Sequence, residues 1–192
     1  MHAFSSFSKM LHFPRPQALL SILPLLSLPP LFNRATAHSC SNPYAGSDHM
    51  HEGQDRLTGR LTIRNGTTAI APVEFSTCTH IKSITFNHDG QLAEIGSWAF
   101  SGTDGVTGAL ILPASLTSIY QCAFCGMRSV ERIMVHAVSL LKNIAKHAFA
   151  GNPALEVVEV PNSVTSIGVG IFDRSYSLNR VIVQGDGAFS EI

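Results

Sequence analysis

The sequence predicts an α/β-type repeat solenoid in which about five units of 23–25 residues each contribute one short parallel strand. The first indication is a recurring phenylalanine. It stands at positions 75, 100, 124, 149 and 172, so the successive spacings are 25, 24, 25 and 23 residues. The second indication is a short alternating aliphatic segment between these phenylalanines, which is typical of a strand with one buried face.

Each phenylalanine ends a nine-residue segment. The segment begins with an aliphatic residue, has isoleucine three positions later, and reaches phenylalanine five positions after that. Four segments keep this pattern: Leu92–Phe100, Leu116–Phe124, Leu141–Phe149 and Val164–Phe172. Thr67–Phe75 is a weaker fifth, with Glu74 where three of the others carry alanine, and we expect it to cap the N-terminal end.

The strands are expected between these segments, at 81–86, 110–112, 130–135, 155–160 and 178–183. Pro113 and Pro161 end two of them, where strand pairing stops. The unit around 110–112 carries one extra residue before its strand. One unit has too few apolar side chains to enclose a core alone. Coils stacked at ~4.8 Å are therefore expected to share one column of phenylalanines.

The N-terminal region has the features of a secretory signal. Lys9 and Arg15 precede an apolar run at 18–32, and Ala35-Thr36-Ala37 follows as a cleavage pattern. The run is shorter than the ~20 residues of a membrane span and contains three prolines. We therefore predict a signal peptide at 1–37, a flexible linker at 38–60, the solenoid at 61–183 and a C-terminal tail at 184–192, with the protein secreted, periplasmic or at the cell surface.

Two alternatives concern this region. Lipid attachment at Cys40 is the less favoured interpretation, because His38 is a poor fit to the position just before a lipidated cysteine. The segment at 49–52 (His-Met-His-Glu) contains two imidazoles and a carboxylate, but it lies in a linker with no scaffold to hold a metal. No metal or other cofactor is expected.

Composition excludes two classes of protein. Thirteen Lys+Arg balance thirteen Asp+Glu, and 45% of the residues are hydrophobic, which is enough to bury a core. Residues 1–37 hold three basic residues and no acidic one, so the remainder has 10 basic against 13 acidic residues, a net charge of −3. A disordered tail and a nucleic-acid binder are both disfavoured.

The chain contains one C-x-x-C motif, Cys122 to Cys125. We interpret the pair as structural thiols, because Phe124 between them belongs to the repeat and no second pair exists to complete a zinc site. Cys78 lies two coils away, about 10 Å, which is beyond the reach of a disulfide to either one. In an oxidising compartment the pair could close locally. No catalytic constellation is evident, so we predict that the chain is not an enzyme.

The outward strand positions form two predicted rows. One row is Thr85, Ile111, Met134, Glu159 and Ile182; its neighbour is Ser83, Ala109, Arg132, Val157 and Arg180. A solvated sheet face is normally polar, yet four of these side chains are large and apolar. Apolar side chains flanked by charged ones indicate a protein-contact surface, whereas β-propensity alone would also select such residues.

The repeat resembles the BspA-like leucine-rich repeats of bacterial and protist surface proteins. Their unit, L-x-x-I-x-x-x-A-F-x-x-C/N-x-x-L-x-x-I-x-I-P-x-S-V, is followed almost letter for letter from Ile144 through Asn152 to Val164. The resemblance covers about 61–183 and departs at 67–75 and at 136–141. It implies adhesion or contact with a host surface.

The sequence therefore predicts a secreted or cell-surface protein that binds a protein ligand through its strand face. The alternative is a structural envelope protein that forms homo-oligomers through its C-terminal coil, because no cap is evident after Val183. Neither hypothesis involves a transmembrane span.

Overall fold

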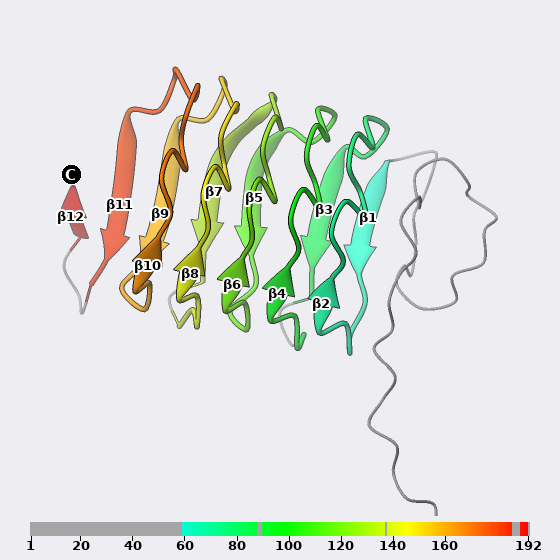
Figure 1. The fold of residues 1–192 in the computed structure, drawn as a ribbon, viewed down its shortest axis with the longest axis horizontal. Helices are drawn as coiled ribbons and strands as arrows, with labels where there is room; N and C mark the ends of the chain where they lie inside the picture. The colour runs from blue at the N-terminus through cyan, green and yellow to red at the C-terminus, as the bar shows by residue number, and fades with distance from the viewer. Residues whose placement is uncertain (1–58, 88–89, 137, 186–188, 192) are drawn as a thin grey trace, which may run out of the picture. The chain divides into compact units, whose positions relative to one another are not determined.

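The computed structural model describes residues 59–87, 90–136, 138–185 and 189–191. The predictions for the signal peptide, Cys40, the 49–52 segment and most of the linker lie outside these residues. In the described part the chain winds into stacked coils, and each complete coil has one longer strand and one two-residue strand on opposite walls (Figure 1).

The longer strands form one wall and the short strands form the other. The longer strands are β1 (Arg60–Ile63), β3 (Ser83–Phe86), β5 (Gly108–Leu112), β7 (Val130–Val135), β9 (Val157–Pro161) and β11 (Arg180–Gln184). The short strands are β2 (Ala69–Ile70), β4 (Glu94–Ile95), β6 (Ser118–Ile119), β8 (Asn143–Ile144) and β10 (Ser166–Ile167). Strand β12 (Phe189–Glu191) follows β11.

Pairing within each wall is parallel, as predicted, apart from β12. The short strands form one sheet in the order β10-β8-β6-β4-β2. The longer strands are divided into a β1-β3 pair and a sheet in the order β12-β11-β9-β7-β5. The break between β3 and β5 lies at the unit that has one extra residue before its strand. Gly108 begins β5 at φ 71°, and the β5–β7 register shifts between Gly108 and Ala109.

The core is a column of stacked aromatic rings. Phe75, Phe100, Phe124 and Phe149 are among the most deeply buried side chains. Successive ring centroids lie 5.1, 5.3 and 5.7 Å apart, with interplanar angles of 10°, 3° and 11°. Phe172 continues the column at 6.2 Å from Phe149. The predicted phenylalanine column is thus confirmed.

The expected α component is wrong, because the described residues contain strands and turns but no helix. Each coil has two backbone positions with positive φ, whereas an α-helix needs an uninterrupted run of negative φ. The first position is held by Val73, Trp98, Cys122, His147 and Gly170, and the second by Thr77, Gly102, Gly126, Gly151 and Arg174. These left-handed residues bend the segment around each phenylalanine into turns.

The C-terminal end also differs from expectation. Strand β12 pairs antiparallel with β11, with Ile182 opposite Glu191, so the last long strand is covered by the residues that were expected to provide no cap. The short strand β10 has no such partner among the described residues.

Candidate functional site

The predicted strand-face rows are aligned by the sheet from β5 to β11. Ile111 lies opposite Met134, and Ile182 lies opposite Glu159. In the neighbouring row Val157 lies between Arg132 on β7 and Arg180 on β11. A repeat of constant length places equivalent residues side by side, which explains why the rows follow from the sequence.

The rows do not continue unbroken into the N-terminal coils. Ser83 and Thr85 lie on β3, which pairs with β1 and is not paired with β5. Strand pairing therefore aligns the rows only from β5 to β11, and the contribution of Ser83 and Thr85 to the surface stays a prediction. The remaining four coils carry the candidate surface.

Exposure on this surface is uneven. Ile111 has 48% of its surface exposed, whereas Met134 and Ile182 are half-buried. Arg132 and Arg180 are exposed on either side of the half-buried Val157. The guanidinium group of the exposed Arg132 can bind a carboxylate in bidentate fashion, and the adjacent apolar side chains supply contact area. The surface is therefore suited to a partner with acidic and apolar groups.

Glu159 has a structural role on this face. Its Oε2 accepts a hydrogen bond from the backbone N–H of Val135 at 3.2 Å and another from Nε2 of Gln184 at 3.2 Å. The β7–β9 register ends at Ile133 opposite Val158, so the carboxylate takes the place of a backbone acceptor beyond that point. The repeat pattern places Glu159 in an outward row but does not reveal this role, since the local end of strand pairing carries no sequence signal.

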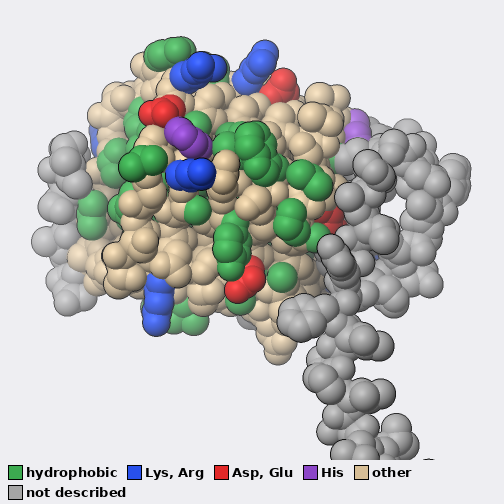
Figure 2. All heavy atoms as spheres, viewed as in Figure 1, with side chains coloured by type: hydrophobic (Ala, Val, Ile, Leu, Met, Phe, Trp, Pro, Cys, Tyr) green, Lys and Arg blue, Asp and Glu red, His purple; other side chains and the backbone are tan. Residues whose placement is uncertain are grey.

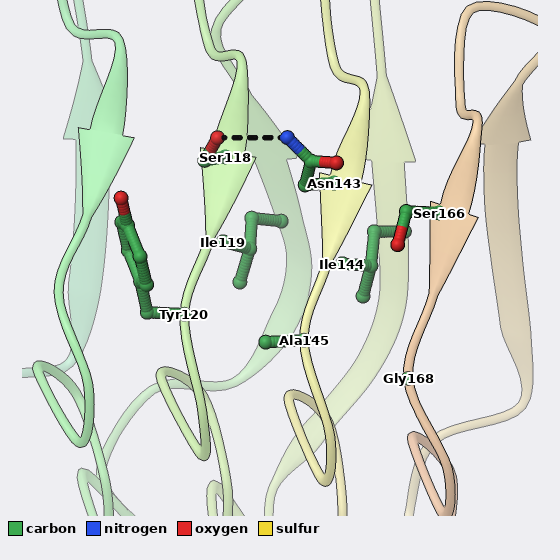
Figure 3. A pocket seen from close by; sticks show the side chains of 8 residues that line it. All are labelled: Ser118, Ile119, Tyr120, Asn143, Ile144, Ala145, Ser166 and Gly168. Atoms are coloured by element: carbon green, nitrogen blue, oxygen red, sulfur yellow. Dashed lines mark hydrogen bonds between the residues drawn. The ribbon is translucent and has the colours of Figure 1, made fainter.

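A shallow hollow of about 320 Å³ lies on the short-strand wall. Figure 3 shows the inward-pointing Ile119 and Ile144 below it, and Ser118 accepts a hydrogen bond from Nδ2 of Asn143 at 3.4 Å. Tyr120 borders the hollow and is 42% exposed. The hollow arises because Ala145 and Gly168 hold the positions equivalent to Tyr120 in the next two coils.

A second groove, of about 330 Å³, follows the turns around the phenylalanine column. Its lining includes Trp98, Cys122 and His147, which hold the same left-handed position in three successive coils. A non-glycine residue in this conformation is strained, so the fold holds these side chains at some cost in free energy. Sequence reasoning missed this groove, because φ values cannot be read from a repeat pattern.

His147 is fixed at one end of that groove. Its Nδ1 lies 3.2 Å from the carbonyl oxygen of Gly170 and 3.3 Å from Oδ2 of Asp173. Both partners are acceptors, so Nδ1 carries the hydrogen. Figure 2 shows hydrophobic side chains interspersed with charged and histidine side chains over the face in view. Within the described ranges no group of three or more His, Cys, Asp or Glu residues is arranged to hold a metal ion.

The cysteines are in two different chemical states. Cys78 is disulfide-bonded, whereas Cys122 and Cys125 are free thiols. Burial, together with the neighbouring Cys125 thiol, raises the pKa of Cys122 to about 12. The predicted absence of a disulfide from Cys78 to either member of the C-x-x-C pair is confirmed. The last of the four cysteines in the sequence, Cys40, lies outside the described residues.

A parallel-strand solenoid with a shared phenylalanine column and an outward strand face defines a leucine-rich repeat protein. The family profile described as BspA type leucine rich repeat region matches residues 54–179 in six copies. The chain belongs to this family. Such solenoids are typically non-enzymatic. The described residues include no helix of sufficient length and apolar character to span a bilayer.

Solved structures share the fold. The pneumococcal vaccine antigen PcpA is 26% identical, with a TM-score of 0.58, over 69% of this chain and 34% of that chain. A leucine rich cell surface protein from Faecalibacterium prausnitzii is 25% identical, with a TM-score of 0.59, over 67% and 33%. A leucine-rich repeat protein from Bacteroides ovatus is 25% identical, with a TM-score of 0.56, over 64% and 33%.

The chain spans about a third of the length of these three structures. No curated protein sequence matches it significantly.

Proposed function

We propose that this chain is an exported protein-binding module that contacts its ligand through the outward face of β5, β7, β9 and β11. The observation that carries the proposal is the Arg132–Val157–Arg180 row beside the exposed Ile111. Two cationic side chains separated by an apolar residue favour a peptide segment in which acidic residues flank an apolar one.

Two further observations support export. Cys78 is disulfide-bonded, and disulfides persist in oxidising compartments. One similar solved structure is described as a cell surface protein. Adhesion to another cell, as a particular kind of protein binding, is part of the proposal and is supported by the family alone.

A peptide selection tests the strand face. Phage-displayed random peptides would be selected on the wild-type chain, and each recovered peptide titrated against Ile111→Asp and against Val138→Asp. Val138 is 69% exposed and lies off the strands, so its variant is the matched control. We expect Ile111→Asp to weaken binding by about tenfold, with enrichment of acidic and apolar residues in the peptides. Peptides that lose no affinity with Ile111→Asp would overturn the proposal.

Self-association through the last coil is the second candidate. In four of the five short strands the isoleucine is buried. The exposed fractions are 1%, 0%, 1% and 3% for Ile70, Ile95, Ile119 and Ile144. In β10, Ile167 is 55% exposed, and the nearby Val169 is 75% exposed. A second copy stacked on this end would bury both side chains and pair with β10.

Sedimentation measures this alternative directly. A concentration series of the full chain by analytical ultracentrifugation is expected to show an oligomer that Ile167→Asp disperses and Ile111→Asp leaves intact. A monomer at every concentration would rule out self-association and leave the strand face as the proposed interface.

A further inference from the structure

Cys122 and Cys125 are held together by a turn. The N–H of Cys125 donates a hydrogen bond to the carbonyl oxygen of Cys122 at 3.2 Å, and a turn of this kind keeps its first and fourth Cα atoms within ~7 Å. Disulfides join residues whose Cα atoms lie within about the same distance. The backbone therefore places the two Cα atoms within the separation that a disulfide requires.

The pair is also reachable from solvent. Both cysteines line the groove of about 330 Å³ that Trp98 and His147 border. The hydroxyl oxygen of Ser101 in the preceding coil lies 3.3 Å from Sγ of Cys125. Cys78 is disulfide-bonded, and disulfides of this kind persist in oxidising compartments. Both cysteines are largely buried, and the groove that they line is the route by which a small oxidant reaches them.

We propose that Cys122 and Cys125 are a dithiol modification site, which a small-molecule disulfide oxidises to an intramolecular disulfide within one coil. Sγ of one cysteine attacks a sulfur of the external disulfide, and one thiol leaves. Sγ of the other cysteine then attacks the mixed disulfide, and a second thiol leaves. The two cysteine protons pass to the two leaving thiols, so the external disulfide is reduced as the pair is oxidised.

The surroundings of the two sulfur atoms set the order of these steps. The thiolate is the attacking form, and burial raises the pKa of Cys122 above its ordinary value, which disfavours its thiolate. Cys125 has the Ser101 hydroxyl beside it, which can donate a hydrogen bond to a thiolate. Cys125 is therefore the first nucleophile, and Cys122 resolves the mixed disulfide.

Peptide mass spectrometry tests the site cleanly. Trypsin cleavage after Lys82 and Arg128 gives a peptide, 83–128, that contains Cys122 and Cys125 and no other cysteine. The folded full chain would be incubated with oxidised glutathione, quenched with acid and digested without reduction. We expect peptide 83–128 to lose two hydrogens and to carry no glutathionyl group. Trp98, the chain's single tryptophan, reports the same event through quenching by the new disulfide.

Two variants test the order of attack. In Cys122→Ser we expect one glutathionyl group to accumulate on Cys125, because no resolving thiol remains. In Cys125→Ser we expect Cys122 to be modified about tenfold more slowly. Equal rates in the two variants would overturn the order. Two glutathionyl groups on wild-type peptide 83–128, or two thiols that still alkylate after prolonged incubation, would overturn the site itself. Val138→Asp, at an exposed position outside both the strand face and the groove, is the matched control and is expected to oxidise like wild type.

Discussion

The rings of Phe100 and Phe124 lie parallel within 3°, with their centroids 5.3 Å apart, although the two residues are separated by a complete coil of the chain. Both side chains are fully buried. Each ring therefore contacts the rings above and below it, and removing one ring affects two coil interfaces.

Phe124→Ala is expected to destabilise the solenoid by about 3–5 kcal/mol, because it leaves a cavity between Phe100 and Phe149 that the rigid coils cannot close. Denaturant unfolding followed by circular dichroism measures the change. Phe172 at the end of the column is only half-buried and provides the comparison. Phe172→Ala should lower the unfolding free energy by less than Phe124→Ala. Equal losses at both positions would contradict a column that is tightest at its centre.

Asn152 links two coils through its side chain. Its Oδ1 accepts a hydrogen bond from the N–H of Met127 at 2.7 Å, and its Nδ2 donates to the carbonyl oxygens of Phe124 and Phe149 at 3.1 and 2.9 Å. Asn152→Ala leaves these buried groups without a partner, so we expect a loss of about 3 kcal/mol in unfolding free energy. Asn152→Asp keeps the acceptor and should lose less at low pH than at neutral pH, where a buried carboxylate faces two carbonyl oxygens.

Glu74 makes the stability of the first coil depend on pH. The side chain is 1% exposed, and burial raises its pKa from 4.5 to about 7, although Oε2 accepts a hydrogen bond from the N–H of Ala71 at 2.8 Å. The folded chain thus binds this proton more tightly than the unfolded chain. The stabilising contribution is complete below about pH 4.5 and is lost as the pH rises through 7.

Glu74→Gln is expected to raise the unfolding free energy by up to roughly 3 kcal/mol above pH 7 and to leave it unchanged near pH 4. Thermal unfolding at a series of pH values measures the difference. The exposed Glu94 on β4 provides the control. In Glu94→Gln the unfolding free energy should depend on pH as it does in the wild type. A uniform offset at every pH would contradict titration of Glu74.

Gly168 allows the last two coils to approach each other. A Cβ atom at this position would overlap the backbone nitrogen of Lys146 in the preceding coil. We therefore expect Gly168→Ala to destabilise the protein by about 1–3 kcal/mol and to widen the hollow beside Ala145. The exposed Ser166 provides a matched control on β10, where alanine should have little effect in the same thermal measurement.

Much of the strand face could be predicted from sequence because a repeat of nearly constant length aligns equivalent residues. The alignment of Ile111 with Met134 and of Val157 with Arg180 follows from this arithmetic. The break between β3 and β5 also lies at the irregularity that the sequence contains, but a pattern of side chains does not say how the backbone responds to one extra residue.

The turn groove could not be predicted in the same way. Trp98, Cys122 and His147 are 24 or 25 residues apart, and their lining of one groove depends on a left-handed backbone at each position. The sequence shows glycine at the equivalent position only once, as Gly170, so the usual signal for positive φ is absent in the other coils.

By itself, the sequence determined the period, the phenylalanine column, the parallel strands and the family. Each of these follows from the spacing of apolar residues, because burying those residues together dominates the free energy of folding. Only the tertiary structure decided that turns stand in place of the α part of the expected fold class, that β12 pairs with β11, and that Glu159 accepts a hydrogen bond from the end of β7. These features depend on backbone dihedral angles and on hydrogen bonds between coils, which the spacing of apolar residues does not specify.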